Sequence, residues 1–218
     1  MIDIVSLIIN ADVTGLESVL IAHPRLANEH IPITKDNPSL AHPLHRISDA
    51  VFSQKITDDQ AVRLASLFIK YGSEVNGHPI QAGKDSPLVA ACSLHADKVA
   101  LLLIDKGANI HHPGTHGGTA LHWAAWCGRP IILKRLIDCG AAINQHCFEF
   151  RATPLFWAIH GLLHDVSANS IDYTKCLEIL LKNGADKNFT NKEGKSIIDL
   201  LRGSKFKHLI QFFSENEP

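Results

Sequence analysis

Apolar residues recur along the chain in short stretches of helical period, and a glycine follows each stretch. Residues 99–104 (VALLLI) and 131–137 (IILKRLI) are two such stretches. A glycine just after a helical stretch is typical of a helix C-cap, because glycine adopts the left-handed conformation without a Cβ clash. The pattern therefore predicts helices that end at Gly72, Gly107, Gly140 and Gly184.

A second recurring feature opens each unit. Ser86 and Thr153 directly precede a proline, and Thr119 and Ser196 open comparable stretches. The hydroxyl caps free amides at a helix start, and a proline in the first turn has no amide to leave unsatisfied. His42, which also precedes a proline, fits the same position with a weaker cap. Each unit thus predicts a short helix, a turn, a longer helix, a glycine stop and a connecting finger.

These features resemble the ankyrin-repeat family, whose units open with T-P-L-H-x-A-A, close with G-A-D-V-N and repeat every 33 residues or so. Residues 119–128 (TALHWAAWCG) with 140–144 (GAAIN) come close to a full unit. The resemblance covers roughly residues 38–213. It implies an all-α solenoid of stacked helix-turn-helix repeats joined by hairpin-like fingers.

The four glycines are spaced by 35, 33 and 44 residues. The long units place insertions between paired helices near 48–60 and 162–171, which are either extra docking surface or helix extensions. The two ends depart from the repeat pattern, as capping units do. We expect one domain of six units, spanning residues 1–37, 38–78, 79–111, 112–145, 146–188 and 189–218.

Composition narrows the classes of function. Lys and Arg number 21 against 22 Asp and Glu, so no basic excess favours nucleic acid. The longest apolar run, 99–104, is too short to cross a bilayer, and the first ten residues lack the basic segment of a signal peptide. The five cysteines form no C-x-x-C pair, which favours reduced thiols. We expect a soluble, cytoplasmic chain that binds neither nucleic acid nor membrane.

A few short motifs suggest candidate chemistry. Residues 194–196 (GKS) are similar to the end of a phosphate-binding loop, but Phe189 stands where that motif needs glycine. Three histidines at 111, 112 and 116 could hold zinc with Cys127 or Cys147, although the spacing matches no common zinc pattern. We expect instead a solvated or partner-contacting finger.

His122 and Cys127 suggest a nucleophile pair, but five residues place them about 140° apart around a helix. The resemblance implies that His122 bonds to the hydroxyl of Thr119. The chain contains no H-E-x-x-H, G-x-S-x-G or G-x-G-x-x-G motif. We therefore expect no enzymatic activity and no cofactor.

The resemblance also implies a concave binding side lined by the fingers and the first helix of each unit. One position of that helix, free of a role in the fold, holds Arg46, Ala90, Trp123, Trp157 and Leu200. Trp123 and Trp157 belong to neighbouring units and should lie ~10 Å apart, the usual spacing of packed helices. The tryptophans form either an aromatic hot spot or a filling between stacked helices.

The resulting prediction is a monomeric adaptor, scaffold or inhibitor that binds a protein or peptide with apolar anchors and some acidic character. The alternative is a small-ligand or metal-binding module that uses the same Trp and His residues. The predicted partner-binding residues are Arg46, His112, Thr115, His116, Trp123, Trp126, Arg129, Arg151, Trp157 and His160.

Overall fold

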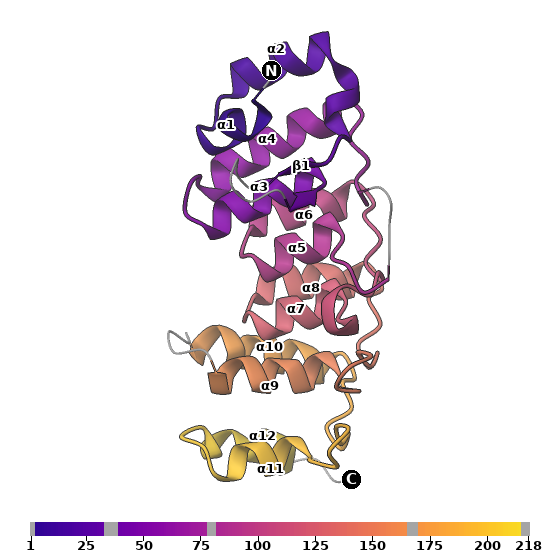
Figure 1. Ribbon diagram of the computed structural model, residues 1–218. Helices are drawn as coiled ribbons and strands as arrows, with labels where there is room; N and C mark the ends of the chain where they lie inside the picture. The colour runs from indigo at the N-terminus through magenta and orange to yellow at the C-terminus, as the bar shows by residue number, and fades with distance from the viewer. Residues whose placement is uncertain (1–2, 33–38, 78–81, 165–169, 215–218) are drawn as a thin grey trace. The chain divides into compact units, whose positions relative to one another are not determined.

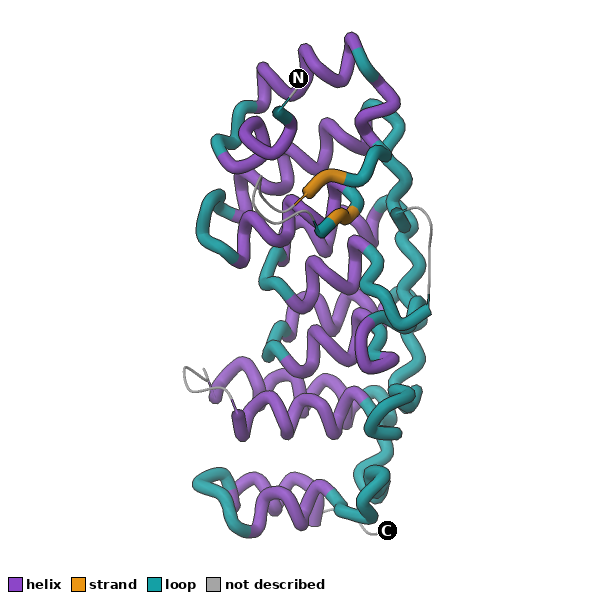
Figure 2. Tube along the Cα trace, viewed as in Figure 1, coloured by secondary structure: helices purple, strands orange, loops and turns teal. Residues whose placement is uncertain are grey.

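The computed structural model describes residues 3–32, 39–77, 82–164 and 170–214, whose regular elements are helices apart from two short strands (Figure 1). The chain divides into two compact units, residues 1–114 and 115–218. Within each unit, short helices lie side by side in antiparallel pairs joined by loops at their ends (Figure 2). The predicted all-α fold of stacked helix pairs is confirmed.

Unit 1 contains two short strands that pair antiparallel, with Ile31 opposite Ala41. Helix α3 packs against α4 and α5, whereas α4 packs against α2 and α6. The first and second helices of successive repeats therefore form separate layers. The elements of unit 1 are α1 (Ile4–Ile9), α2 (Val13–Ala22), η1 (Pro24–Ala27), β1 (Ile31–Pro32), β2 (Leu40–Ala41), α3 (Pro43–Phe52), α4 (Asp58–Lys70), α5 (Pro87–Ser93) and α6 (Asp97–Asp105).

Unit 2 repeats this arrangement. Helix α7 packs against α8 and α9, α10 packs against α8 and α9, and α11 also contacts α9. Its elements are η2 (Thr115–Gly117), α7 (Ala120–Trp126), α8 (Pro130–Asp138), α9 (Pro154–His164), α10 (Ser170–Lys182), α11 (Ile197–Arg202), η3 (Lys207–Ile210) and α12 (Gln211–Ser214).

The predicted helix starts and the predicted glycines after the longer helices are both confirmed. Ser86 Oγ accepts a hydrogen bond from Val89 N at 3.3 Å, and α5 begins at the next residue. Ser196 Oγ caps α11 in the same way. The glycines that close the longer helices have left-handed backbones, with φ between 80° and 93°: Gly72, Gly107, Gly140 and Gly184.

The two insertions extend helices by about one turn. Helices α3 and α9 have 10 and 11 residues, whereas α5 and α7 have 7 each. The insertion near 48–60 ends in a short loop before Thr57, which caps α4. Part of the insertion near 162–171 lies outside the described residues.

Asparagines near the end of one repeat hold the turn of the next. Asn28 donates to Gly72 O at 2.8 Å and accepts from Glu74 N at 2.7 Å. Asn144 makes the same pair of bonds to Gly184 O and Asp186 N. These bonds satisfy backbone groups that the left-handed glycine leaves outside the helix.

Candidate functional site

Unit 2 has a groove of about 520 Å³ whose walls are mostly aromatic. We call it the aromatic groove. Its lining comes from η2, α7, the loop before α9, α9 and the segment around α11. The lining residues are His116, Trp123, Trp126, Phe150, Ala152, Phe156, Trp157, His160, Asn191, Glu193, Lys195 and Leu200.

Helix α7 places Trp123 and Trp126 on one face, because residues three apart are neighbours on a helix. Both side chains are partly exposed. Trp157 comes from α9 and contacts both of them, with ring centroids 5.1 Å from Trp123 and 5.8 Å from Trp126. The ring planes meet at 82° and 72°, the edge-to-face geometry that aromatic pairs prefer.

Trp157 forms the floor of the aromatic groove. Its side chain is only 5% exposed, and it lies so close to Gly118 that a Cβ there would approach Trp157 Cη2 to 2.8 Å. Of the two interpretations of the tryptophans, packing describes Trp157, whereas Trp123 and Trp126 retain exposed surface. The ~10 Å expected between Trp123 and Trp157 is wrong for their rings, because both lean across the helix spacing toward each other.

A buried histidine fastens α7 to the loop before α9. Thr119 N and Oγ1 lie 3.1 and 2.9 Å from His122 Nδ1, so the predicted contact with Thr119 is confirmed. Because Nδ1 accepts from the Thr119 amide, Nε2 carries the proton and donates to Gln145 O and Ala152 O. Burial lowers the pKa of His122 to about 4. The residue is therefore a neutral clamp, which fixes Ala152 in the groove wall.

One ion pair and one histidine–carboxylate contact lie at the rim of the aromatic groove. Glu193 Oε2 lies 3.0 Å from Lys195 Nζ, and Glu149 Oε2 lies 2.5 Å from His116 Nδ1. Burial, followed by the adjacent His164, lowers the pKa of His160 below its ordinary value. The carboxylate and the ammonium group that line the groove, Glu193 and Lys195, therefore offset each other beside a mostly aromatic surface.

The structure brings five of the predicted residues together in this groove: His116, Trp123, Trp126, Trp157 and His160. Thr115, Arg129 and Arg151 are also in unit 2 but do not line it. Arg129 is the N-cap residue of α8 and is partly buried, and Arg151 is exposed with a left-handed φ of 49°.

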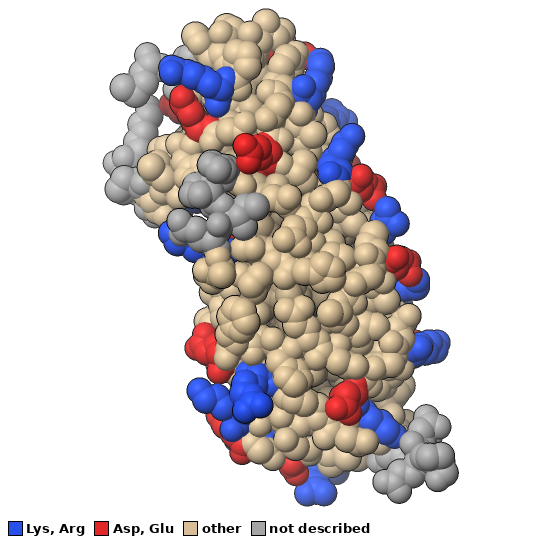
Figure 3. Space-filling view, turned by 90° about the vertical axis from the view of Figure 1, so that its right-hand side faces the viewer, with Lys and Arg blue, Asp and Glu red and all other residues tan. Residues whose placement is uncertain are grey.

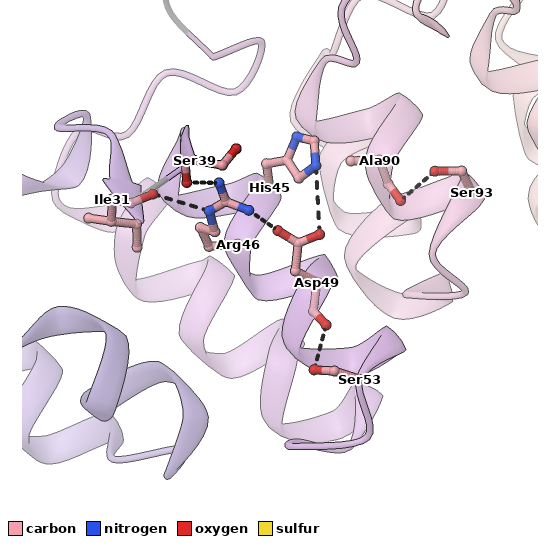
Figure 4. Close-up of polar contacts among 8 residues, drawn as sticks. All are labelled: Ile31, Ser39, His45, Arg46, Asp49, Ser53, Ala90 and Ser93. Carbon is pink, nitrogen blue, oxygen red and sulfur yellow. Dashed lines mark hydrogen bonds and ion pairs between the residues drawn. The ribbon is translucent and has the colours of Figure 1, made fainter. Parts of the chain in front are cut away.

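Two predicted contact residues are buried in unit 1. Arg46 is 7% exposed, and its guanidinium donates to Ile31 O, Ser39 O and Asp49 Oδ2 (Figure 4). His112 is 5% exposed, and its Nε2 lies 2.7 Å from Lys84 O. Both expectations of an exposed contact side chain are wrong, because each polar head is turned inward to bind backbone carbonyls. His111 and His116 are exposed as expected.

Unit 1 has its own groove of about 550 Å³, between α1 and the end of α3. Most of its polar lining is already engaged, since Arg46 bonds to Asp49 and Asp3 bonds to Ser6. His45 also approaches Asp49 in this network (Figure 4). The remaining walls are mainly aliphatic, with Phe52, Ser53 and Lys55 at the end of α3 and just after it. The aromatic groove offers more varied contacts and is the stronger candidate.

Sequence reasoning missed Phe150, Phe156 and the turn that carries Asn191, Glu193 and Lys195. Phe150 is 44% exposed beside Trp157, with ring centroids 6.4 Å apart. A signal for Phe150 was available in the sequence. It is an aromatic residue in the finger that follows the unit whose first helix carries Trp123 and Trp126. The 191–195 turn had none, because its residues are typical of any polar connection.

The described surface and side chains also bear on other classes of site. On the face shown in Figure 3, Lys and Arg lie close to Asp and Glu, and much of the area between them is uncharged. Within residues 3–32, 39–77, 82–164 and 170–214, no group of three His, Cys, Asp or Glu side chains is placed to hold a metal ion. None of the described helices has the length and apolarity needed to span a membrane.

Comparison with known proteins adds independent information. The model of a protein family described as "Ankyrin repeats (3 copies)" matches residues 58–147 and 109–191. Similar curated proteins include phosphocholine transferase AnkX of Legionella pneumophila (27% identical over 73% of this chain), palmitoyltransferase ZDHHC13 of Mus musculus (32% over 45%) and ankyrin repeat and SOCS box protein 6 of Mus musculus (30% over 54%). The matching part of the chain covers 17%, 14% and 26% of their respective lengths.

Proposed function

Since the chain belongs to the ankyrin-repeat family, we propose that it is a non-enzymatic module that holds a peptide segment of a partner protein in the aromatic groove. Ankyrin repeats generally mediate interactions between proteins, and the repeats account for most of the residues described. Two of the similar proteins are transferases by name, but the chain matches only 17% and 14% of them.

The observation that supports this site is the partly exposed pair Trp123 and Trp126 above the buried Trp157. Tryptophan is enriched among the residues that dominate binding energies, because it buries a large area with few rotatable bonds. A rigid floor under two accessible rings is pre-organised, so less side-chain entropy is lost on binding. His122 contributes by fixing the wall at Ala152.

We further propose that the chain acts as a monomer in the cytoplasm and binds neither nucleic acid nor membrane. The nearly balanced charge of 21 basic and 22 acidic residues supports the first exclusion. All five cysteines carry thiols, which suits a reducing compartment. Light scattering of the purified chain would measure the molecular mass in solution, and a concentration-dependent dimer would contradict the proposed monomer.

A displayed library of random 12-residue peptides tests the proposed site without knowledge of the partner. The immobilised chain should enrich peptides that bind wild type and lose at least about tenfold in affinity to Trp126→Ala, the size of effect expected for a hot spot. Ile131→Ala is the matched control, because Ile131 is 73% exposed in the same unit and does not line the groove.

Thermal unfolding of each variant separates lost binding from lost folding. Trp126→Ala should remain folded, since the side chain is partly exposed. Failure to enrich any peptide, or enrichment of peptides that bind Trp126→Ala and Ile131→Ala equally well, would overturn the proposed function.

A further inference from the structure

We infer that the occupant of the aromatic groove is an uncharged, proline-rich segment in the polyproline II conformation. This inference rests on the proposed function and names the chemistry of the partner. It replaces the acidic segment expected from the sequence. Three properties of the groove carry it: the angles between its rings, the pairing of its carboxylate Glu193 with Lys195 and an accessible hydrogen-bond donor on its aromatic wall.

The rings form creases rather than a flat surface. Trp126 and Phe150 meet the floor ring of Trp157 at 72° and 61°. Because the floor ring is buried, a compact apolar ring fits between the exposed parts of Trp126 and Phe150 that rise from it. Prolines in a polyproline II helix project such rings at three residues per turn, and aromatic-lined grooves bind them in this way.

The charge balance decides against a charged occupant. An aromatic groove can also hold an ammonium or guanidinium group, but a desolvated cation needs a carboxylate that is not already neutralised. Glu193 is the carboxylate among the residues that line the groove, and it already pairs with Lys195. An acidic occupant would likewise have to compete with Glu193 for Lys195. An uncharged segment leaves this pair intact.

The hydrogen-bond donor on the aromatic wall is the indole of Trp126. None of the described residues accepts a hydrogen bond from its Nε1, and this atom is not among the fully buried polar atoms. The carbonyl groups of a polyproline II helix make no internal hydrogen bonds and are all free to accept. The Trp123 Nε1 differs, because it is buried and without an acceptor in the described part of the chain, so a ligand in the groove does not reach it.

This contrast gives a matched pair of variants. Trp126→Phe removes the accessible donor and keeps an aromatic ring, whereas Trp123→Phe removes an inaccessible one. We expect Trp126→Phe to weaken binding of a proline-rich peptide about three- to tenfold, the range of one hydrogen bond. Trp123→Phe should change it less than Trp126→Phe. An equal effect of the two variants would contradict the role of the Trp126 donor.

The probe is N-acetylated, C-amidated decaproline, titrated to millimolar concentration while the three tryptophan indole resonances are followed by NMR. The Trp126 resonance should move most, and Trp126→Ala should abolish saturation. A decapeptide of Gly and Ala and one that carries a single trimethyl-lysine are the controls. Stronger binding of the trimethyl-lysine peptide than of decaproline would overturn the inference in favour of a cation.

The random library separates this inference from the proposed function. Enriched peptides with prolines spaced by three support both. Enriched peptides without proline that still lose affinity to Trp126→Ala leave the proposed function standing and overturn the inference. No enriched peptide and no response to decaproline overturn both.

Discussion

Gly161 lies in α9 where this helix passes the end of α7 at contact distance. A Cβ at this position would lie 2.0 Å from Trp126 O and 3.0 Å from Tyr173 Cε1. Tyr173 fixes that carbonyl, because its hydroxyl donates to Trp126 O at 2.7 Å. Tyr173 therefore holds the carbonyl of Trp126 by a hydrogen bond, and the missing side chain of Gly161 leaves the space that this carbonyl occupies.

Gly161→Ala should lower the free energy of unfolding by about 1–3 kcal/mol, the usual cost of overpacking. The sign of this change in free energy distinguishes overpacking from helix propensity, because alanine in a helix is otherwise favoured over glycine by about 1 kcal/mol. Urea denaturation measures the change. Gly203→Ala is the control, since a Cβ there has no atom within 4 Å, and it should leave stability nearly unchanged. Equal stabilities of the two variants would mean that α9 moves aside without cost.

The buried clamp His122 predicts a dependence of stability on pH. Burial lowers its pKa in the folded chain to about 4, from about 6.5 when unfolded. Between these values the unfolded chain binds more protons, so stability is complete above pH 6.5 and falls as the pH drops toward 4. The full loss is roughly 3 kcal/mol at 1.36 kcal/mol per pKa unit.

Unfolding by urea at pH 7.5 and pH 5.0 checks this contribution. His122→Asn should be less stable than wild type at pH 7.5 and should show a smaller loss between the two pH values, because asparagine has no charge to gain. An identical loss in wild type and variant would assign the pH dependence to other groups.

The residues that sequence reasoning misplaced share one physical cause. The repeat period fixes where a Cβ points, and it placed Arg46 and Trp123 in equivalent positions of α3 and α7. It does not fix where a long polar side chain ends. The guanidinium of Arg46 turns toward Ile31 O in β1 and Ser39 O just before β2, on either side of residues 33–38.

At the scale of single helices, the caps determine where each element begins. Ser86 Oγ accepts from Val89 N at the start of α5, while Ser66, in the middle of α4, instead donates its hydroxyl to Val62 O. Serine competes with the helix backbone in the interior but satisfies a free amide at the first turn.

The same substitution should therefore have opposite effects at these two serines. Ser86→Ala should destabilise the chain by about 1 kcal/mol, the typical cost of a lost cap. Ser66→Ala, at an exposed position, should stabilise it by a few tenths of a kcal/mol through helix propensity. Chemical denaturation of both variants measures the difference, and a change of the same sign in both would contradict the capping role of Ser86.

Helix starts and stops were predictable because their signals are local. Serine before proline and glycine after an apolar run act within one turn, so no tertiary contact was needed to place Pro87 or Gly107. The extent of α3 and α9 was not predictable, since an inserted polar residue such as Ser53 is equally compatible with a helical turn or a loop. The hydrogen bonds of Asn28 and Asn144 were not predictable, because they are not local. Their partners lie 44 and 40 residues away along the chain.

At the scale of the whole molecule, the division into residues 1–114 and 115–218 makes the unfolding behaviour informative. The chain has three tryptophans, and all of them lie in unit 2. Tryptophan fluorescence therefore reports on unit 2, whereas far-UV circular dichroism reports on the helices of both units. In repeat proteins each repeat contacts only its neighbours, so distant parts can lose structure separately.

Phe68 in α4 and Leu133 in α8 are both fully buried, one in each unit. Phe68→Ala should cost about 3–5 kcal/mol and move part of the circular dichroism transition to lower urea concentration, while the fluorescence transition stays near that of wild type. Leu133→Ala, at about 2–5 kcal/mol, should move the fluorescence transition as well. Transitions that coincide for both probes in both variants would mean that the chain unfolds as one cooperative body. Separate transitions would instead show that the repeats that form the aromatic groove hold their structure after unit 1 has unfolded.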